Sequence, residues 1–266
     1  MWVDSHCHIQ PDHARGHAAA DLLKRARAAG VDWMVCVGTD LASSRAAVEL
    51  AAEHADVFAS VGLHPHDAER FNAEWPQLCE IARSAPNVVG IGECGFDLYY
   101  EHSPRDEQAV AFRAQIELAL ELDQTLVIHT RDAWDDTFDT LCAIGVPART
   151  IVHCFSGGPV EAARAIELGC YLSFSGIVSF KAADDVRAAA AMTPPDRLLV
   201  ETDSPFLAPV PLRGKDNEPC YIGHVGTALA DARGVRVEEI AELTSVNAAS
   251  AFARGGACGG IARGNA

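Results

Sequence analysis

The chain carries few positive charges for its size. Its 266 residues include 21 lysines and arginines against 37 aspartates and glutamates, a net charge of −16 at pH 7. Only three residues are lysines: Lys24, Lys181 and Lys215. Because non-specific binding of nucleic acid depends on clustered lysine and arginine, this composition excludes a surface that coats phosphates generally. A polyanionic substrate must be held locally, by metal ions or by a few placed groups.

Long apolar runs and paired cysteines are also missing. No stretch is long enough to cross a bilayer, and the start, MWVDSHCH, lacks the basic and apolar segments of a secretory signal. The nine cysteines show no paired framework, which favours free thiols in a reducing compartment. We therefore expect a cytoplasmic protein without membrane contact.

Eight short runs rich in β-branched and apolar residues recur along the chain. Most are continuous rather than alternating, as expected for parallel strands buried on both faces. Eight strand–helix repeats in about 250 residues are typical of an α/β (β/α)8 TIM barrel in a single domain. A doubly wound sheet is the alternative, but no G-x-G-x-x-G motif joins a strand to a helix. The expected strands cover 2–6, 31–38, 57–64, 88–93, 125–129, 150–154, 170–176 and 197–203.

The clearest helix is predicted for SPRDEQAVAFRAQIELALELD. Ser103 can cap this helix, and Pro104 suits its first position. Phe112, Ile116 and Leu120 follow at i, i+4 spacing, which indicates one apolar face.

The sequence also predicts a second helix, a long loop and the end of the domain. A second helix is predicted within 157–169 and should close at Gly169. The Pro-rich stretch 204–219 follows the eighth strand, so we expect an active-site loop there. The barrel domain is predicted to cover 1–254, and 255–266 to form a Gly-rich flexible tail.

Histidines and carboxylates recur at the ends of the expected strands. Side chains alternate faces along a strand, so His6 and His8, with Cα atoms roughly 6.6 Å apart, can reach one metal ion. The carboxyl ends of barrel strands converge on one face, where active sites lie. Six ligands exceed what one tetrahedral zinc needs and suit two metal ions sharing a bridging carboxylate, which we assign to Glu93. The predicted ligands are His6, His8, Glu93, His129, His153 and Asp203.

These residues also have a structural interpretation. Any one alone would more often be a satisfied polar group or a helix cap, and their common place at the strand ends is what favours a metal site. Cys7, Cys94 and Cys154 each adjoin a predicted ligand, and alternation turns them to the opposite face, into the strand–helix layer. We therefore predict buried, inert thiols there.

The motifs that hold these residues resemble the TatD-type metal-dependent deoxyribonucleases, within the amidohydrolase-like barrels. The resemblance runs from about Val3 to about Phe252, nearly the whole chain. Its motifs are DSHCH, GLHPH, GECGFD, IHTRDA, HCFSG, SFSGIVSFK, ETDSPFLAP, RGKDNEP and TSVNAASAF.

The resemblance implies two divalent metal ions, with Mg, Mn and Zn as candidates, and a division of the ligands between them. Other barrels of the superfamily bridge their metals with a carbamylated lysine. None of the three lysines here lies at the end of a central strand, so Glu93 is left as the bridge. One ion is assigned to His6, His8 and Asp203, and the other to His129 and His153, with Glu93 between them.

The activity implied is hydrolysis of DNA phosphodiesters, as by a 3′–5′ exonuclease trimming single strands. Two close metal ions acidify a water, and Asp203 beside it can also move the proton, so Glu93 and Asp203 are the predicted catalytic residues. Three alternatives stay open: removal of a D-amino acid from transfer RNA, hydrolysis of another ester or amide, and a non-catalytic metal-binding scaffold. The acidic charge fits a site-limited exonuclease better than a processive DNA binder.

Four residues are predicted to contact the substrate, with single-stranded DNA as the partner. His64 ends the third strand, and the resemblance suggests that it touches a phosphate; a hydrogen bond within its loop is the alternative. Arg131 can face inward or pair with a carboxylate such as Asp132. Arg213 and Lys215 lie in the loop after the eighth strand and suit a nucleic-acid backbone, with solvated charges as the alternative.

Aromatic residues near Glu93 are a weaker signal. Phe96, Tyr99 and Tyr100 follow it and can stack on a base, although core packing is expected for at least one of them.

His66 is predicted to be structural. We see no feature specific for a dimer or for an obligate protein partner, so a monomer is expected.

Overall fold

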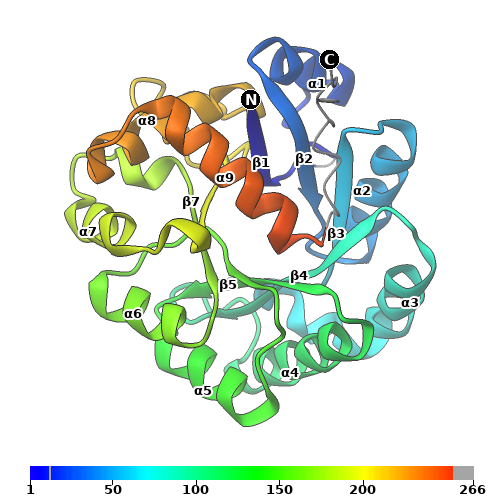
Figure 1. Ribbon diagram of the computed structural model, residues 1–266. Coiled ribbons are helices and arrows are strands. Elements are labelled where there is room, and N and C mark those ends of the chain that lie inside the picture. The colour runs from blue at the N-terminus through cyan, green and yellow to red at the C-terminus, as the bar shows by residue number, and fades with distance from the viewer. Residues whose placement is uncertain (12, 254–266) are drawn as a thin grey trace, which may run out of the picture.

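A parallel eight-stranded sheet curves into a barrel in the computed structural model, which describes residues 1–11 and 13–253 (Figure 1). The strands are neighbours in chain order. An isolated bridge joins Cys7 to Ser204, and the His8 amide donates to the Ser204 carbonyl at 2.7 Å, which brings the two edges together. The predicted (β/α)8 barrel is confirmed. Its strands are β1 (Trp2–Cys7), β2 (Val31–Val37), β3 (Val57–Val61), β4 (Val88–Asp97), β5 (Thr125–Arg131), β6 (Thr150–Val152), β7 (Tyr171–Phe174) and β8 (Leu198–Val200).

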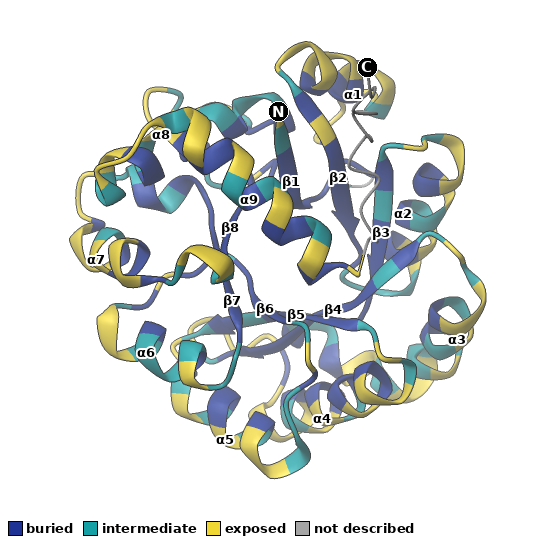
Figure 2. Cartoon of the chain, in the orientation of Figure 1, coloured by how far each residue is buried: buried dark blue, intermediate teal, exposed yellow. Residues whose placement is uncertain are grey.

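Helices surround the barrel and present their buried faces to it (Figure 2). Short 3-10 turns lie beside several of them: η1 (Pro65–Arg70), η2 (Gly176–Ser179), η3 (Pro195–Arg197) and η4 (Pro219–Tyr221). The helices are α1 (Ala19–Ala28), α2 (Leu41–Glu53), α3 (Phe71–Ser84), α4 (Arg105–Leu122), α5 (Trp134–Ile144), α6 (Pro159–Glu167), α7 (Asp184–Met192), α8 (Ile222–Arg233) and α9 (Val237–Ala251).

Helix α9 crosses one end of the barrel (Figure 1). Its Ala248 and Ala251 pack on apolar side chains from inside the barrel. The Thr125 hydroxyl, at the start of β5, donates to the Ala251 carbonyl at 2.6 Å, and the Asn247 amide donates to the Leu198 carbonyl at 2.8 Å. Because these contacts lie where strands begin, the amino end of the barrel is closed and the carboxyl end is left for a site.

The start of α4 differs from its prediction. Pro104 is the N-cap residue, and the Ser103 side chain does not cap the helix. Instead, the Ser103 hydroxyl donates to the His66 carbonyl at 2.9 Å and accepts from the Glu69 amide at 3.2 Å. This hydroxyl is therefore used to hold η1, which is why local helix rules misassigned it.

The two predicted helices form, one with a shorter apolar face than expected and the other with the expected end. Phe112 and Ile116 are fully buried, whereas Leu120 is 43% exposed, so the apolar face of α4 is shorter than the pattern indicated. Helix α6 ends just before Gly169, whose φ of 80° is a conformation that favours glycine.

Strand β4 continues past the predicted end at Glu93, as far as Asp97. Its register with β5 shifts between Ile91 and Cys94, and glycines on either side of Glu93 allow a close approach. A Cβ on Gly92 would lie 2.3 Å from the Val127 carbonyl oxygen, and one on Gly95 would lie 2.0 Å from that of His129. Such an irregularity redirects a side chain within a strand, which places Glu93 inside the barrel mouth.

The remaining predictions concern the cysteines, membrane-spanning helices and the end of the chain. Cys7 and Cys94 are buried among the strand–helix core, as predicted, and the eight cysteines within the described residues are free. Within the same residues, no helix has the length and apolarity needed to cross a membrane. The predicted end of the domain at 254 and the tail at 255–266 lie outside the described residues.

Candidate metal centre

A pocket of about 690 Å³ opens at the carboxyl ends of the strands. Five of the six predicted ligands line it: His8, Glu93, His129, His153 and Asp203. The sixth, His6, is fully buried beneath them, with its Nε2 atom 3.1 Å from that of His8. Asp203 lies three residues beyond β8 and has a φ of 55°, so strand alternation alone does not place it.

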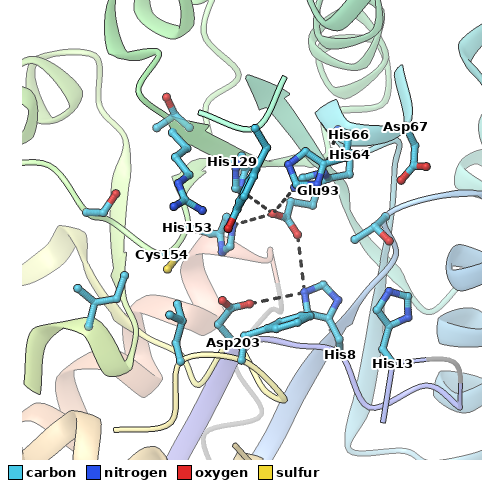
Figure 3. Close-up of a pocket in the computed structure, with 18 residues that line it drawn as sticks. His8, His13, His64, His66, Asp67, Glu93, His129, His153, Cys154 and Asp203 are labelled. Atoms are coloured by element: carbon cyan, nitrogen blue, oxygen red, sulfur yellow. Dashed lines mark hydrogen bonds and ion pairs between the residues drawn. The ribbon is translucent and has the colours of Figure 1, made fainter. Parts of the chain in front are cut away.

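Glu93 lies between two groups of donors (Figure 3). Its Oε1 atom lies 2.8 Å from His153 Nε2 and 3.0 Å from His129 Nδ1. Its Oε2 atom lies 3.3 Å from His6 Nε2 and 3.7 Å from His8 Nε2. The Asp203 carboxylate completes the second group, 3.6 Å from His8 Nε2 and 3.9 Å from His6 Nε2.

Three of the ligand histidines are oriented from behind by oxygen acceptors. An acceptor without a proton of its own fixes the N–H of the imidazole on that side. The opposite nitrogen then presents its lone pair to the pocket, an arrangement that is common for metal-binding histidines. The pairs are His8 Nδ1 with the Val37 carbonyl (2.9 Å), His153 Nδ1 with Glu201 Oε1 (3.2 Å) and His129 Nε2 with Asp97 Oδ2 (3.2 Å).

The nitrogen lone pairs and carboxylate oxygens that converge in this way are suited to bind a cation. The bare nitrogens of His129 and His153 face a carboxylate oxygen of Glu93, and two acceptors so close repel unless a proton or a cation lies between them. His153 Nε2 and His6 Nδ1 are buried without a hydrogen-bond partner in the described part of the chain. Imidazole and carboxylate donors together suit Zn, Mn and related divalent ions.

Electrostatics favour the metal-binding forms of His6 and Glu93 but raise the pKa of His153. Burial lowers the pKa of His6 to about 4, so this imidazole is neutral near pH 7. Burial opposes ionisation of Glu93, but the surrounding histidines, His153 first, hold its pKa well below the usual range. Burial lowers the pKa of His153, yet the Glu93 and Glu201 carboxylates raise it well above its ordinary value. Without a cation a proton takes that position, so protons and metal compete for His153.

His64 also lines the pocket, but it differs from the candidate ligands because its protonated ring nitrogen faces the pocket. Its Nδ1 accepts the His66 backbone N–H at 3.1 Å, and burial lowers its pKa to about 4. The neutral ring therefore carries its proton on Nε2, which lies 3.4 Å from Glu93 Oε1. His64 presents a hydrogen-bond donor to the pocket, where His8, His129 and His153 present lone pairs.

The other predicted substrate residues divide into two sets. Arg131 lines the pocket and lies over the rings of Tyr99 and Tyr100. Arg213 lies outside the pocket lining, with its guanidinium 3.8 Å from the centroid of the Phe180 ring. Lys215 also lies outside the lining, in the same exposed loop.

One smaller prediction is wrong, one is confirmed and one is too narrow. Cys154 lines the pocket instead of the strand–helix layer, because β6 ends at Val152 and a φ of 44° at Cys154 breaks the alternation. Phe96 is 2% exposed and packs on the Phe112 ring, so it is an aromatic residue of the core, as expected for at least one of the three that follow Glu93. His66, expected to be structural, lines the pocket as well as binding Asp97.

Sequence reasoning missed three buried carboxylates. Asp97 and Glu201 orient ligand histidines. Asp4 accepts from the Thr202 amide at 2.9 Å and its hydroxyl at 2.6 Å, and burial raises the pKa of Asp4 to about 7. Asp4 and Glu201 each precede a predicted ligand by two positions, and Asp97 follows Glu93 by four. An even spacing from a predicted ligand was the available signal, although of these three carboxylates only Asp4 and Asp97 lie on strands.

An α/β barrel with candidate metal-binding histidines and carboxylates at its carboxyl end is an architecture that suits a metal-dependent hydrolase. The model of the TatD related DNase family matches residues 3–253, and the chain belongs to this family. The uncharacterized metal-dependent hydrolase YabD of Bacillus subtilis is 37% identical over 253 residues, which cover 95% of this chain and 99% of YabD. The 3′-5′ ssDNA/RNA exonuclease TatD of Erwinia amylovora is 35% identical over 239 residues, covering 87% and 92%. The crystal structure of YjjV, a TatD homolog from Escherichia coli, is similar with a TM-score of 0.88 and 28% identity, covering 95% and 98%.

Proposed function

We propose that this hydrolase is a 3′–5′ exonuclease that cleaves phosphodiesters of single-stranded DNA at two divalent metal ions. The observation that carries the proposal is the placement of Glu93, whose two carboxylate oxygens face two different groups of donors. The relative named as an exonuclease supports the choice of substrate.

The six candidate ligands divide the tasks of this reaction. His6, His8 and Asp203 would hold one metal ion, His129 and His153 would hold the other, and Glu93 would be shared between the two. Bound divalent ions supply an acidified water and offset the charge of the phosphodiester and of the leaving oxygen. Asp203 also accepts the proton of the attacking water, since its carboxylate faces the pocket beside His8.

Substrate contacts come from groups that carry protons or positive charge. His64 donates its Nε2–H to a phosphate oxygen, because its other nitrogen is already an acceptor. Arg131 binds the next phosphate from the pocket wall. Arg213 and Lys215, on the loop after β8, contact the DNA backbone further from the scissile bond. Only a few positively charged side chains are needed, which is compatible with a net charge of −16.

A metal-rescue assay tests the proposal. The chelator-treated protein receives Mg, Mn, Zn or Co singly, together with single-stranded DNA labelled at either end. We expect a ladder of products that shortens from the 3′ end with at least one metal and is absent in Glu93→Gln. Glu117→Gln, the same change on the exposed face of α4, should keep full activity.

The same assay distinguishes the alternatives. A wild-type chain that binds metal but leaves DNA intact would refute the nuclease proposal. Hydrolysis of a D-aminoacyl-tRNA or of a simple ester by that preparation would then assign the site to ester hydrolysis. Retained metal without turnover of any ester or phosphodiester would leave only the scaffold role.

A further inference from the structure

Two exposed tyrosines lie side by side at the edge of the pocket. Tyr99 and Tyr100 are 57% and 51% exposed, more than the intermediate burial that is usual for tyrosine. Tyr100 also lines the pocket. The two rings meet edge to face, with centroids 4.8 Å apart, and His102 lies parallel to the Tyr100 ring at 5.5 Å. An aromatic surface is thus presented to solvent beside the metal centre.

Arg131 joins this surface and brings a positive charge to it. Its guanidinium carbon lies 4.0 Å from the centroid of Tyr99 and 4.6 Å from that of Tyr100. No carboxylate of the described residues forms an ion pair with it, in contrast to Arg27, which binds Asp56 through two hydrogen bonds. Stacking on the rings leaves N–H edges of the guanidinium for another acceptor.

A single carboxylate ties the tyrosines to the metal centre. Asp97 is 1% exposed, and its Oδ1 atom accepts the backbone N–H groups of Tyr99 at 3.1 Å and Tyr100 at 2.9 Å. Its Oδ2 atom lies 3.2 Å from Nε2 of His129, whose other nitrogen faces Glu93. The position of the aromatic surface is therefore fixed relative to the place where a phosphodiester would be cleaved.

We propose that Tyr99, Tyr100 and Arg131 form a nucleotide subsite next to the scissile bond. The nucleobase stacks on the exposed tyrosine rings, and the guanidinium of Arg131 donates to the phosphate of the same nucleotide. Rings accept any base through its flat face, so this subsite recognises a nucleotide without selecting its sequence. The proposal rests on the proposed nuclease function and specifies how that site holds its substrate.

The test compares substrates with and without bases. One is a thymidine octamer, and the other has tetrahydrofuran residues instead of nucleosides at its two 3′-terminal positions. We expect the wild type to cleave the base-free end roughly tenfold less efficiently in kcat/KM, the scale of one lost base stack. In Tyr99→Leu/Tyr100→Leu the ratio of kcat/KM for the normal octamer to that for the base-free octamer should approach one. In Tyr99→Phe/Tyr100→Phe the ratio should stay at the wild-type value.

Binding gives a readout separate from turnover. In a Glu93→Gln background, the Kd of a fluorescent octamer should rise about tenfold with the leucine pair and stay constant with the phenylalanine pair. Arg131→Gln should weaken binding and lower its salt dependence, whereas Arg113→Gln, which removes an equal charge from the exposed face of α4, should change neither.

The outcomes separate this subsite from the nuclease function itself. A wild type that cleaves both octamers equally well would overturn the subsite and leave the nuclease function standing. A wild type that cleaves neither would refute the nuclease function. Equal binding by the leucine and phenylalanine pairs would show that the tyrosines do not stack on the substrate.

Discussion

Replacing Glu201 by glutamine should weaken one metal position and spare the other. Glu201 is fully buried, and its Oε1 atom accepts from His153 Nδ1 at 3.2 Å and from the Cys154 amide at 2.8 Å. Glutamine keeps the size and one oxygen acceptor but removes the charge that makes His153 a strong donor. Loss of such a partner typically costs 10- to 100-fold in metal affinity, or about 1.4–2.8 kcal/mol.

Competition with a fluorescent chelator, followed by metal analysis, measures this effect. We expect one of two bound ions to weaken by that factor, while the ion held by His6, His8 and Asp203 keeps its affinity. Glu167→Gln, on the exposed surface of α6, should leave both affinities unchanged. Unaltered binding of both ions by Glu201→Gln, or an equal loss of both in a folded protein, would refute the role given to Glu201.

Three further changes probe the framework. Gly95→Ala should lower the free energy of unfolding by about 3 kcal/mol or more, because its Cβ would lie 2.0 Å from the His129 carbonyl oxygen; urea denaturation showing a loss under 1 kcal/mol would contradict this. Asn217→Ala removes two 2.7 Å hydrogen bonds to the carbonyls of Thr202 and Phe206, on either side of Asp203. The free energy of unfolding should fall by about 2 kcal/mol, and the metal content should fall as well. A variant that is equally stable and fully loaded with metal would show that Asp203 does not depend on these hydrogen bonds. The Arg27 guanidinium lowers the pKa of Asp56, so this pair stabilises the fold above pH 3.8 and loses its effect as the pH falls further. Asp56→Asn should therefore cost less than about 1 kcal/mol at pH 7 and progressively less as the pH falls below 3.8. Urea midpoints that shift equally at pH 7 and in acid would count against the ion pair.

The barrel and the clustering of the candidate ligands could be predicted because both depend on regular rules. Continuous apolar strands separated by helices define the fold, and the carboxyl ends of those strands converge whatever the details of the loops. His6, His8 and His129 needed only alternation along a strand to be found.

The remaining features depend on departures from regular strands. Glu93 lies inside β4, at a register shift that two glycines permit. Cys154 and Asp203 have positive φ values beyond their strands, so alternation misplaced the first and succeeded with the second only by proximity. Asp97 and Glu201 act through contacts with histidines far along the chain, and such pairings follow from the barrel geometry rather than from local sequence.

The most direct test of the account is the anomalous scattering of crystals grown with Mn or Zn, recorded at the metal absorption edge. We predict one peak bound by Glu93 Oε2 with His6, His8 and Asp203, and another bound by Glu93 Oε1 with His129 and His153. A single peak, or two peaks of which only one contacts Glu93, would contradict the bridging role and with it the proposed two-metal chemistry.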